Sequence, residues 1–301
     1  MDHRVSGDRP VRFGLVGAGP WARAVHAPAI VAHPGTELVA VWARRPAAAG
    51  DLAAAHGAAV ADDPAALFAS VDAVAFAVPP DVQADLAGQA ARAGRHLVLD
   101  KPVGASVAQA ERLAGTIGDA GVASLVLLTS RYVPEVVDWV AEAAGRDWAV
   151  GTANWVGGAL LSGPYSHSPW RHERGAVLDV GPHVFDLLEA GLGPVADVVA
   201  AARGCHDVWQ VLFAHESGAR SSATLSIGLP VEPNVVDLAL YGTAGRLPLP
   251  RPSGSPVDSY LRLLDELVTM IRAGRAEHPL DVRRGLGLQR LIDRVEGLAV
   301  P

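Results

Sequence analysis

The first residues able to do recognisable chemistry form a glycine-rich turn near the start of the chain. The run Gly17-Ala18-Gly19-Pro20-Trp21-Ala22 stands between an apolar stretch and a helical pattern. In such a turn the first glycine bends the chain, the second lets the backbone approach a pyrophosphate, and a small sixth residue permits close helix packing. The helix N-terminus then favours phosphate. The pattern predicts dinucleotide binding by Gly17, Gly19, Pro20, Trp21 and Ala22, the alternative being an ordinary tight turn.

The residues after the second apolar run bear on which dinucleotide binds. At this place a carboxylate would bond the ribose 2′-hydroxyl of NAD, whereas arginine accommodates the 2′-phosphate of NADP. This chain has Trp42-Ala43-Arg44-Arg45. Arg44 and Arg45 match a phosphate in charge and geometry. We therefore predict a preference for NADP(H), with NAD(H) as the alternative cofactor; two solvated arginines at a helix start would also fit the sequence.

A second group of residues could move protons. Asp179 and His183 stand four residues apart in Leu178–Ala190, a stretch whose pattern predicts a helix, so their side chains would share one face. A histidine can take or give a proton near neutral pH. Lys101 is the only lysine of the chain. Arginine cannot exchange a proton at neutral pH. A single lysine in an arginine-rich chain therefore indicates that its position requires an amine that can exchange one. The alternatives are a solvated surface lysine for Lys101, a histidine packed by chance at the surface for His183, and a helix-start carboxylate for Asp179.

The elements that must position these residues divide the chain into two parts. Before residue 129, short apolar runs alternate with helical stretches, which predicts right-handed crossovers and a parallel sheet buried on both faces. The expected strands are 11–16, 37–42, 73–78, 96–99 and 122–128, and the expected helices are 21–32, 46–56, 64–69, 82–93 and 106–119.

After residue 128 consecutive β-like runs with short connections predict a mostly antiparallel sheet. The expected strands are 148–156, 195–203, 208–214, 219–227 and 235–241, and the expected helices are 134–144, 178–190, 256–273 and 281–298. We therefore expect an α/β protein. Its domains would be 1–128, which binds the dinucleotide in a doubly wound parallel sheet, and 129–301, an α+β domain for substrate and oligomerisation whose last helix is free to pack back on the first.

Composition excludes several classes of function. Half of the residues are hydrophobic, enough for a sizeable core, and the formal charge of −7 offers no basic surface for nucleic acid. No apolar stretch is long enough for a membrane span, and the first ten residues form a polar tail without a signal-peptide pattern. One cysteine, Cys205, allows no intrachain disulfide and fits a reducing cytoplasm. The acidic and histidine residues lack metal-ligand spacing, so no metal is expected.

Further motifs surround the residues singled out above. Ala77-Val78-Pro79-Pro80 and Asp100-Lys101-Pro102 each end an apolar run, and Ser168-Pro169-Trp170-Arg171 precedes the stretch that holds Asp179 and His183. With the glycine turn, this ensemble resembles the Gfo/Idh/MocA family (glucose–fructose oxidoreductase, inositol dehydrogenase and rhizopine catabolism proteins) over roughly residues 11–295. The resemblance implies a Rossmann domain, then a domain with a large antiparallel sheet whose exposed face forms a homodimer or homotetramer. It also implies NAD(P)-dependent oxidation of a sugar or cyclitol hydroxyl, or the reverse reduction.

The resemblance also implies roles for individual residues. The family's Glu-Lys-Pro motif falls on Asp100-Lys101-Pro102 and its Asp-x-x-x-His pair on Asp179 and His183, which makes Lys101, Asp179 and His183 the expected catalytic residues. Lys101 would donate a hydrogen bond to the developing alkoxide or carbonyl, and His183 would exchange the carbinol proton. The expected substrate contacts are Trp170, Arg171 and His167, of which Trp170 and Arg171 fit a packing role equally well. The remaining expected cofactor contacts are Val78, Pro79, Pro80, Asp100 and Lys101.

Three departures from the family pattern put the substrate pocket in doubt more than the reaction. The family's glutamate is Asp100, its histidine after the paired prolines is matched by Gln83, and its glycine-rich run is reduced to Arg174-Gly175-Ala176. A cofactor-binding regulator or pseudoenzyme on the same fold is the main alternative function, although the retained lysine, aspartate and histidine favour an enzyme. A short-chain reductase is excluded, because no tyrosine is followed by lysine four residues on.

Overall fold

The computed structural model describes residues 9–300, so most of the polar tail expected for the first ten residues lies outside the described residues. The chain divides into two compact units. The first consists of Met1–Tyr132 and Gly254–Gly287, and the second of Val133–Ser253 and Leu288–Pro301. The sequence analysis placed everything after residue 128 in one domain and let only the last helix return. In the structure the helix before it also belongs to the first unit.

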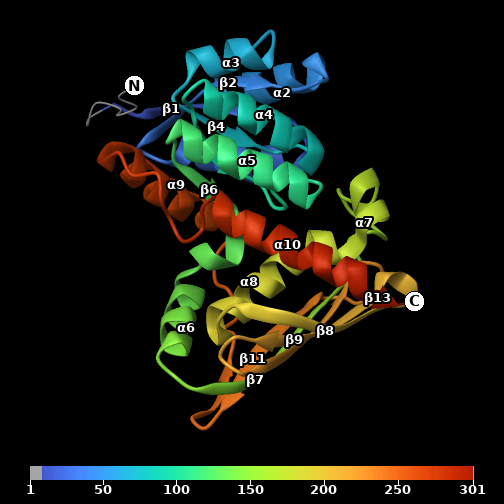
Figure 1. Ribbon diagram of the computed structural model, residues 1–301. Coiled ribbons are helices and arrows are strands. Elements are labelled where there is room, and N and C mark those ends of the chain that lie inside the picture. Colours follow the sequence, from blue (N-terminus) through green and yellow to red (C-terminus); the bar gives the residue numbers. More distant parts are fainter. Residues whose placement is uncertain (1–8, 301) are drawn as a thin grey trace. The chain divides into compact units, whose positions relative to one another are not determined.

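Six parallel strands form the sheet of the first unit, in the order β3-β2-β1-β4-β5-β6 (Figure 1). They are β1 Val11–Val16, β2 Thr36–Trp42, β3 Ala59–Val60, β4 Ala73–Phe76, β5 His96–Leu99 and β6 Ser124–Val126. All residues of β4 and β5 are buried, as expected of strands covered on both faces. The doubly wound parallel sheet is therefore confirmed. The strand order reverses between β1 and β4, and ligands of such folds bind at this reversal, outside the carboxyl ends of the strands.

Helices cover this sheet in two sets. They are the π-helix η1 Ala22–His26, α1 Ala27–Ala32, α2 Pro46–His56, α3 Pro64–Ser70, α4 Pro80–Arg92, α5 Val107–Ala120, the 3-10 helix η2 Thr129–Tyr132 and α9 Pro256–Ala273. Helices α4 and α5 lie side by side (Figure 1), whereas α1 packs against α2 and α9. The side chains of Asp63 and Ser106 accept hydrogen bonds from the first turns of α3 and α5, which explains where both helices begin.

The helix after the glycine turn contains wide π-turns for a reason that the sequence supplies. Pro28 has no N–H, and its ring clashes with the carbonyl four residues earlier in a regular α-helix. Over Ala22–His26 the chain adopts the wider π form, and the N–H of Ala27 bonds the carbonyl of Ala22. His26, at the end of this segment, is fully buried.

Seven strands form the sheet of the second unit, in the order β12-β11-β7-β10-β9-β8-β13. They are β7 Trp148–Val156, β8 Val195–Arg203, β9 Trp209–His215, β10 Arg220–Ser226, β11 Val235–Gly242, β12 Gly245–Pro248 and β13 Ala299–Val300. Neighbouring strands run antiparallel except β7 with β10 and β8 with β13, so the mostly antiparallel sheet is confirmed. Buried and less buried residues alternate along β9, which indicates one covered face.

The helices of the second unit are α6 Pro134–Ala144, α7 Pro169–Asp179, α8 Gly181–Leu192 and the 3-10 helix η3 Cys205–Asp207, and α10 Val282–Leu298 begins in the first unit and ends in the second. In this unit, α7 and α8 contact the strands of the sheet, and α6 packs against α8. Phe185 of α8 meets Phe213 of β9 with ring centroids 5.1 Å apart. A Cβ on Gly191 would lie 2.7 Å from Leu240, so the glycine lets α8 approach the sheet closely. This packing carries the residues of α8 into the core.

Candidate functional site

Gly17 makes a turn that other residue types could not make without rearrangement. Its φ of 115° favours glycine, and a Cβ there would lie 2.3 Å from the carbonyl oxygen of Ala77. The N–H of Gly17 donates to the carbonyl of Trp42 at 2.8 Å. The end of β1 is thus tied to the ends of β2 and β4, at the reversal of the strand order.

Gly19 leaves the outer side of this turn open. A Cβ on Gly19 would have no heavy atom within 4 Å, which is the space that close approach of a pyrophosphate requires. Pro20 begins the helix, Trp21 is half-buried, and Ala22 is fully buried behind them. The N–H groups of this first helical turn carry partial positive charge. The space at Gly19 and the polarity of the first helical turn therefore suit a phosphate group.

Arg23 braces the glycine turn, a role that the sequence analysis missed. Its Nε donates to the carbonyl of Ala18 at 3.2 Å, and its Nη2 donates to the carbonyl of Ala48, in α2, at 2.9 Å. Both acceptors are backbone carbonyls, which every residue has. No sequence motif could therefore have predicted this contact.

The residues after β4 form the opposite side of the turn. A Cβ on Gly17 would lie 3.1 Å from Cγ1 of Val78. Pro79 precedes α4, and Pro80 is its first residue, where a missing N–H costs nothing. The structure thus brings Val78, Pro79 and Pro80 to the same edge of the sheet as the glycine turn.

Arg44 and Arg45 lie at this edge too, after β2. Both are exposed, and Arg45 directly precedes α2 without capping it by its side chain. The carbonyl of Trp42, two residues before Arg44, holds the N–H of Gly17. The two guanidinium groups therefore follow the strand end that anchors the glycine turn, and they are exposed to an incoming anion.

Lys101 follows β5 at the same carboxyl edge. Asp100 and Lys101 are half-buried, Asp100 Oδ1 accepts a hydrogen bond from the N–H of Lys101 at 2.8 Å, and the Lys101–Pro102 peptide bond is cis. Gln83 of α4, noted in the sequence only as a departure, is fully buried and hydrogen-bonds the backbone of Asp100 and Pro102. The structure thus adds a residue to the surroundings of Lys101.

His26 and Tyr260 form a buried pair in the first unit. His26 Nδ1 lies 3.0 Å from the hydroxyl of Tyr260, and His26 Nε2 has no hydrogen-bond partner among the described residues. Burial lowers the pKa of His26 to about 3. The pKa of Tyr260 is raised well above its usual range, by burial first and by the charge of Asp100 second. Both shifts favour the neutral forms of the two side chains at pH 7.

In the second unit, Asp179 and His183 are both nearly buried, with 8% and 7% of their surface exposed. Arg171 Nε donates to Asp179 Oδ2 at 3.1 Å. The ring of His183 stacks on Trp155 with centroids 5.6 Å apart. The structure therefore joins Asp179 to an expected substrate residue and adds Trp155, which no motif had indicated.

The expectation that Leu178–Ala190 forms one helix is wrong. Asp179 is the last residue of α7, and His183 lies in the first turn of α8. Pro182 has no N–H to continue the first helix, and the N–H of His183 bonds the carbonyl of Val180 only three residues back. Asp179 and His183 therefore lie on two helices and do not share one face of a single helix.

The helix that leads to Asp179 is broken at Gly175, whose φ of 67° and ψ of −157° are non-helical. A Cβ there would lie 2.1 Å from Asp207 Oδ1. Asp207 accepts hydrogen bonds from the Ala176 N–H at 2.5 Å and from Trp209 Nε1 at 3.0 Å. His206 and Asp207 both have positive φ, 55° and 54°, which costs a non-glycine residue about 1–3 kcal/mol unless its surroundings compensate. Asp207 thus fixes the break.

Arg174 anchors the same break from its other side. Its Nε and Nη2 donate to Glu296 of α10 at 3.1 and 2.6 Å, a bidentate pair. Within Arg174-Gly175-Ala176, Arg174 therefore supplies an ion pair beside the glycine at which the helix breaks.

Arg171, which donates a hydrogen bond to Asp179, also lies against two aromatic rings. Its guanidinium lies 4.3 Å from the centroid of Trp170 and 4.6 Å from that of Tyr165. Trp170, Arg171 and Tyr165 are half-buried, whereas His167 is exposed in the loop before α7. Aromatic faces beside a few fixed polar groups are typical of small-molecule sites.

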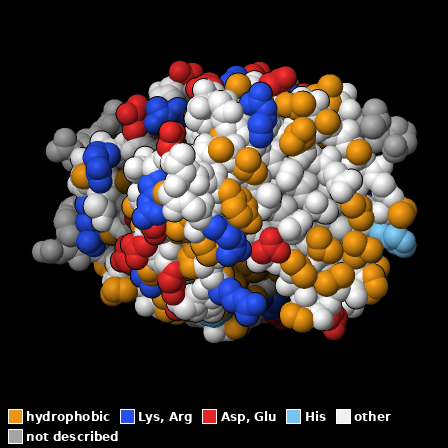
Figure 2. Space-filling view, turned by 90° about the horizontal axis from the view of Figure 1, so that it is seen from below, with side chains coloured by type: hydrophobic (Ala, Val, Ile, Leu, Met, Phe, Trp, Pro, Cys, Tyr) orange, Lys and Arg blue, Asp and Glu red, His pale blue; other side chains and the backbone are white. Residues whose placement is uncertain are grey.

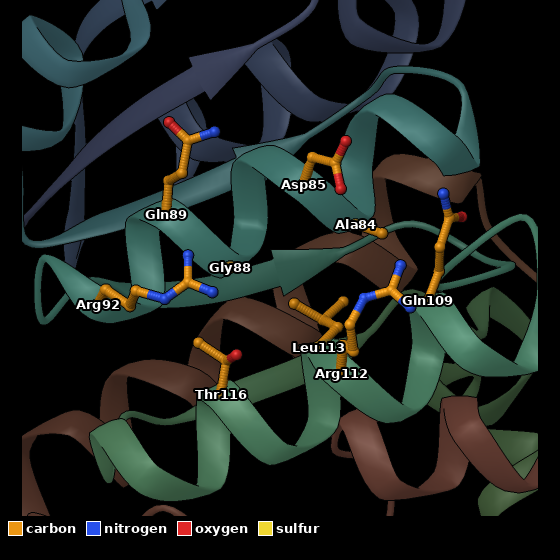
Figure 3. Close-up of a pocket in the computed structure, with 9 residues that line it drawn as sticks. All are labelled: Ala84, Asp85, Gly88, Gln89, Arg92, Gln109, Arg112, Leu113 and Thr116. Carbon is orange, nitrogen blue, oxygen red and sulfur yellow. The ribbon is translucent and has the colours of Figure 1, made fainter.

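A surface groove between α4 and α5 contains none of the expected site residues (Figure 3). It is lined by Ala84, Asp85, Gly88, Gln89, Arg92, Gln109, Arg112, Leu113 and Thr116. Its charged side chains are exposed, as on any solvated helix surface. Among residues 9–300, no three His, Cys, Asp or Glu side chains are grouped to hold a metal. None of the helices described in the structure is long and apolar enough to cross a membrane.

Two regions of the chain match the models of one protein family. Residues 11–127 match "Oxidoreductase family, NAD-binding Rossmann fold", and residues 141–248 match the "GFO/IDH/MocA C-terminal domain". The first match contains the glycine turn and Lys101, and the second contains Asp179 and His183.

Individual proteins are similar to the chain as well. Inositol 2-dehydrogenase of Rhizobium meliloti is 31% identical over 64% of this chain and 58% of that protein, so the match spans little more than half of this relative. A dTDP-3,4-didehydro-2,6-dideoxy-alpha-D-glucose 3-reductase of Streptomyces antibioticus is 28% identical over 80% of this chain and 76% of its own. Among solved structures, the WlbA dehydrogenase of Bordetella pertussis in complex with NADH and UDP-GlcNAcA has a TM-score of 0.83 and 26% identity, covering 97% and 96% of the two chains.

Proposed function

Because this chain belongs to the Gfo/Idh/MocA family of NAD-binding oxidoreductases, we propose that it transfers a hydride between a nicotinamide dinucleotide and a carbinol or ketone carbon of a sugar, cyclitol or similar polyol. The observation that carries the proposal is the placement of Lys101 at the carboxyl edge of the parallel sheet, the edge that holds the open glycine turn. The names of two relatives, which act on a cyclitol and on a nucleotide-linked sugar, support the substrate class.

A bound nicotinamide supplies or accepts the hydride, and the residues of this chain manage the accompanying proton and charge. The ammonium of Lys101 donates a hydrogen bond to the oxygen of the reacting carbon as charge develops there. His183 takes the proton of a carbinol or returns it to an alkoxide. Asp179, fixed by Arg171 at 3.1 Å, accepts a hydrogen bond from a substrate hydroxyl. Trp170 and Arg171 contact the substrate, and His167 adds a polar group at the exposed loop.

The screen that tests this function offers polyols and keto sugars with oxidised and reduced cofactor, and follows absorbance at 340 nm. Turnover of at least one compound is expected, and Lys101→Ala should lower kcat by a factor of ~100 or more while the protein stays folded. Arg92→Ala, in the groove of Figure 3, is the matched cationic control and should have little effect. Tight cofactor binding without any turnover would support the alternative, a regulator or pseudoenzyme.

For the cofactor we propose a preference for NADP(H). The exposed Arg44 and Arg45 follow the strand end that anchors the glycine turn, and a carboxylate for the 2′-hydroxyl is lacking at this place in the sequence. The ratio of kcat/KM for NADPH and NADH measures the preference. Replacing both arginines with alanine should lower kcat/KM for NADPH by about 10-fold or more and leave that for NADH almost unchanged. A wild-type preference for NADH would refute this proposal.

For the assembly we propose a homodimer or homotetramer formed through the sheet of the second unit. Exposed apolar side chains occur on β7, β8, β9 and β11 of this sheet: Val150, Val199, Leu212, Val235, Val236 and Tyr241. Figure 2, seen from the side where β7 and β11 lie in Figure 1, shows hydrophobic side chains gathered on this face. Leu212→Glu should reduce the mass measured by light scattering to that of a monomer, whereas Val137→Glu on α6 should not. An unchanged mass for Leu212→Glu would contradict the proposal.

A further inference from the structure

The backbone on both sides of Lys101 is held by one side chain, that of Gln83 in α4. Gln83 is fully buried. Its Oε1 accepts a hydrogen bond from the N–H of Asp100 at 2.8 Å. Its Nε2 donates to the carbonyl of Asp100 at 2.8 Å and to that of Pro102 at 3.3 Å. The residue before Lys101 and the residue after it are therefore fixed by a single amide group.

These bonds replace the pairing that the sheet no longer supplies. β5 ends at Leu99, and its register with β6 also ends there, so Asp100–Pro102 continue beyond the ladder. A primary amide carries the donor and acceptor groups of a peptide unit. Gln83 uses both on Asp100, as a neighbouring strand would. The carboxylate of Asp100 adds the bond to the N–H of Lys101 at 2.8 Å.

We propose that Gln83 is a positioning residue for Lys101, because holding the backbone of Asp100 and Pro102 fixes the Cα of Lys101 and the direction in which its side chain leaves the backbone. Displacement of a reacting group by ~1 Å can lower turnover by ~100-fold. A side chain whose bonds all go to the backbone can therefore still control the rate. The effect on turnover rests on the proposed function of Lys101, whereas the placement of the amine can be measured without any substrate.

The hydrogen-bonding groups of each amino acid decide which substitutions preserve the turn. Methionine matches the length of glutamine but offers only a weak acceptor, and asparagine has the full amide on a stem one methylene shorter. The two nitrogens of neutral histidine point away from opposite sides of the ring, so histidine can keep only one of the two bonds to Asp100. We expect Gln83→Met and Gln83→Asn to lose the wild-type placement of Lys101, and Gln83→His to retain part of it.

Lys101 is the only lysine of the chain, which makes it a single-site probe. Reductive methylation with ¹³C-formaldehyde gives one lysine dimethylamine signal in ¹H–¹³C NMR, apart from that of the N-terminal amine. The chemical shift of this signal should differ from that of wild type in Gln83→Met and Gln83→Asn, and should differ less in Gln83→His.

Gln89→Met is the matched control, because Gln89 lies on the same helix but lines the exposed groove of Figure 3. The proposal is overturned if the Lys101 signal of Gln83→Met and Gln83→Asn matches that of wild type and of this control while their circular dichroism is native. If Gln83→Met does not fold, Gln83→Asn decides the question alone.

Turnover of a substrate found by the screen gives a second measurement. Gln83→Met and Gln83→Asn should lower kcat by about 10-fold or more, with the KM of the cofactor within about 2-fold, and Gln83→His should lower kcat less. A changed Lys101 signal together with a fully active Lys101→Ala would refute the proposed function and support the positioning by Gln83. An inactive Lys101→Ala together with an unchanged signal would refute the positioning alone.

Discussion

Replacing His26 with asparagine removes an imidazole whose proton affinity depends on folding. Burial lowers the pKa of His26 to about 3 in the folded chain, against an ordinary value of 6.5. Below pH 6.5 the unfolded chain binds this proton, and the folded chain does not until about pH 3. Lowering the pH through this window therefore favours unfolding. Asparagine places an amide where Nδ1 bonds the hydroxyl of Tyr260, but it does not titrate.

The size of the effect follows from the two pKa values. Each pH unit inside the window is worth about 1.4 kcal/mol. Between pH 7.5 and pH 4.5, burial of neutral His26 therefore removes about 3 kcal/mol from the free energy of unfolding. The free energy of unfolding of a folded domain is typically about 5–15 kcal/mol, so this loss is a large part of it. His26→Asn should be less stable at pH 7.5, since it leaves a void, and should lose about 3 kcal/mol less on acidification.

The assay is urea unfolding at several pH values, followed by hydrogen exchange of the peptide that contains η1 and α1, since the two units need not unfold together. Burial also lowers the pKa of His215, but that contribution is common to wild type and variant and cancels in the difference. Equal acid sensitivity of the two proteins would refute the reasoning. So would an NMR titration of the His26 ring with a midpoint near 6.5.

Gly17→Ala should abolish binding of NADP⁺, measured by thermal shift, because the new Cβ overlaps the carbonyl oxygen of Ala77 at a positive φ. Gly19→Ala meets no protein atom, so it should fold normally and bind NADP⁺ more weakly; unchanged binding would show that the phosphates do not approach this residue. Asp207→Ala removes the acceptor that fixes the break in α7 and should lower the free energy of unfolding by about 1–3 kcal/mol, measured in urea. Asp138→Ala, exposed on α6, is its control and should cost less than about 0.5 kcal/mol.

The bounds of a helix or strand are predicted accurately from the sequence where neighbouring residues set them. The structure gives α6 and β7 the bounds that the pattern predicts, 134–144 and 148–156, because a proline starts the helix and the strand's apolar run ends at glycines. The start of α7 could not be predicted, since it follows a stretch rich in glycine, serine and proline. Its break is held by the distant Asp207 and Glu296. Pro182 was a readable signal that one helix could not run from 178 to 190.

The residues of the candidate site likewise divide into those that the sequence predicts and those that it does not. Residues within motifs, such as Gly17 and Lys101, lie where the sequence predicts them in the first unit, at the carboxyl edge of the sheet. Arg23 and Gln83 were missed as supports, because their partners are backbone groups common to all residues. The sequence also could not predict that α9 belongs to the first unit, because the order of elements along the chain does not reveal which surface an amphipathic helix covers.

The division of the first unit between two stretches of chain has a consequence for synthesis on the ribosome. α9, which packs on α1 and supplies Tyr260 to His26, is made only after the whole of Val133–Ser253. At about 5–20 residues per second, roughly ten seconds pass between the last strand of the parallel sheet and the helix that completes its cover. Throughout that interval the nascent dinucleotide-binding unit lacks part of its core. A chain that stalls before residue 256 would therefore present an open apolar surface to chaperones rather than a finished cofactor domain.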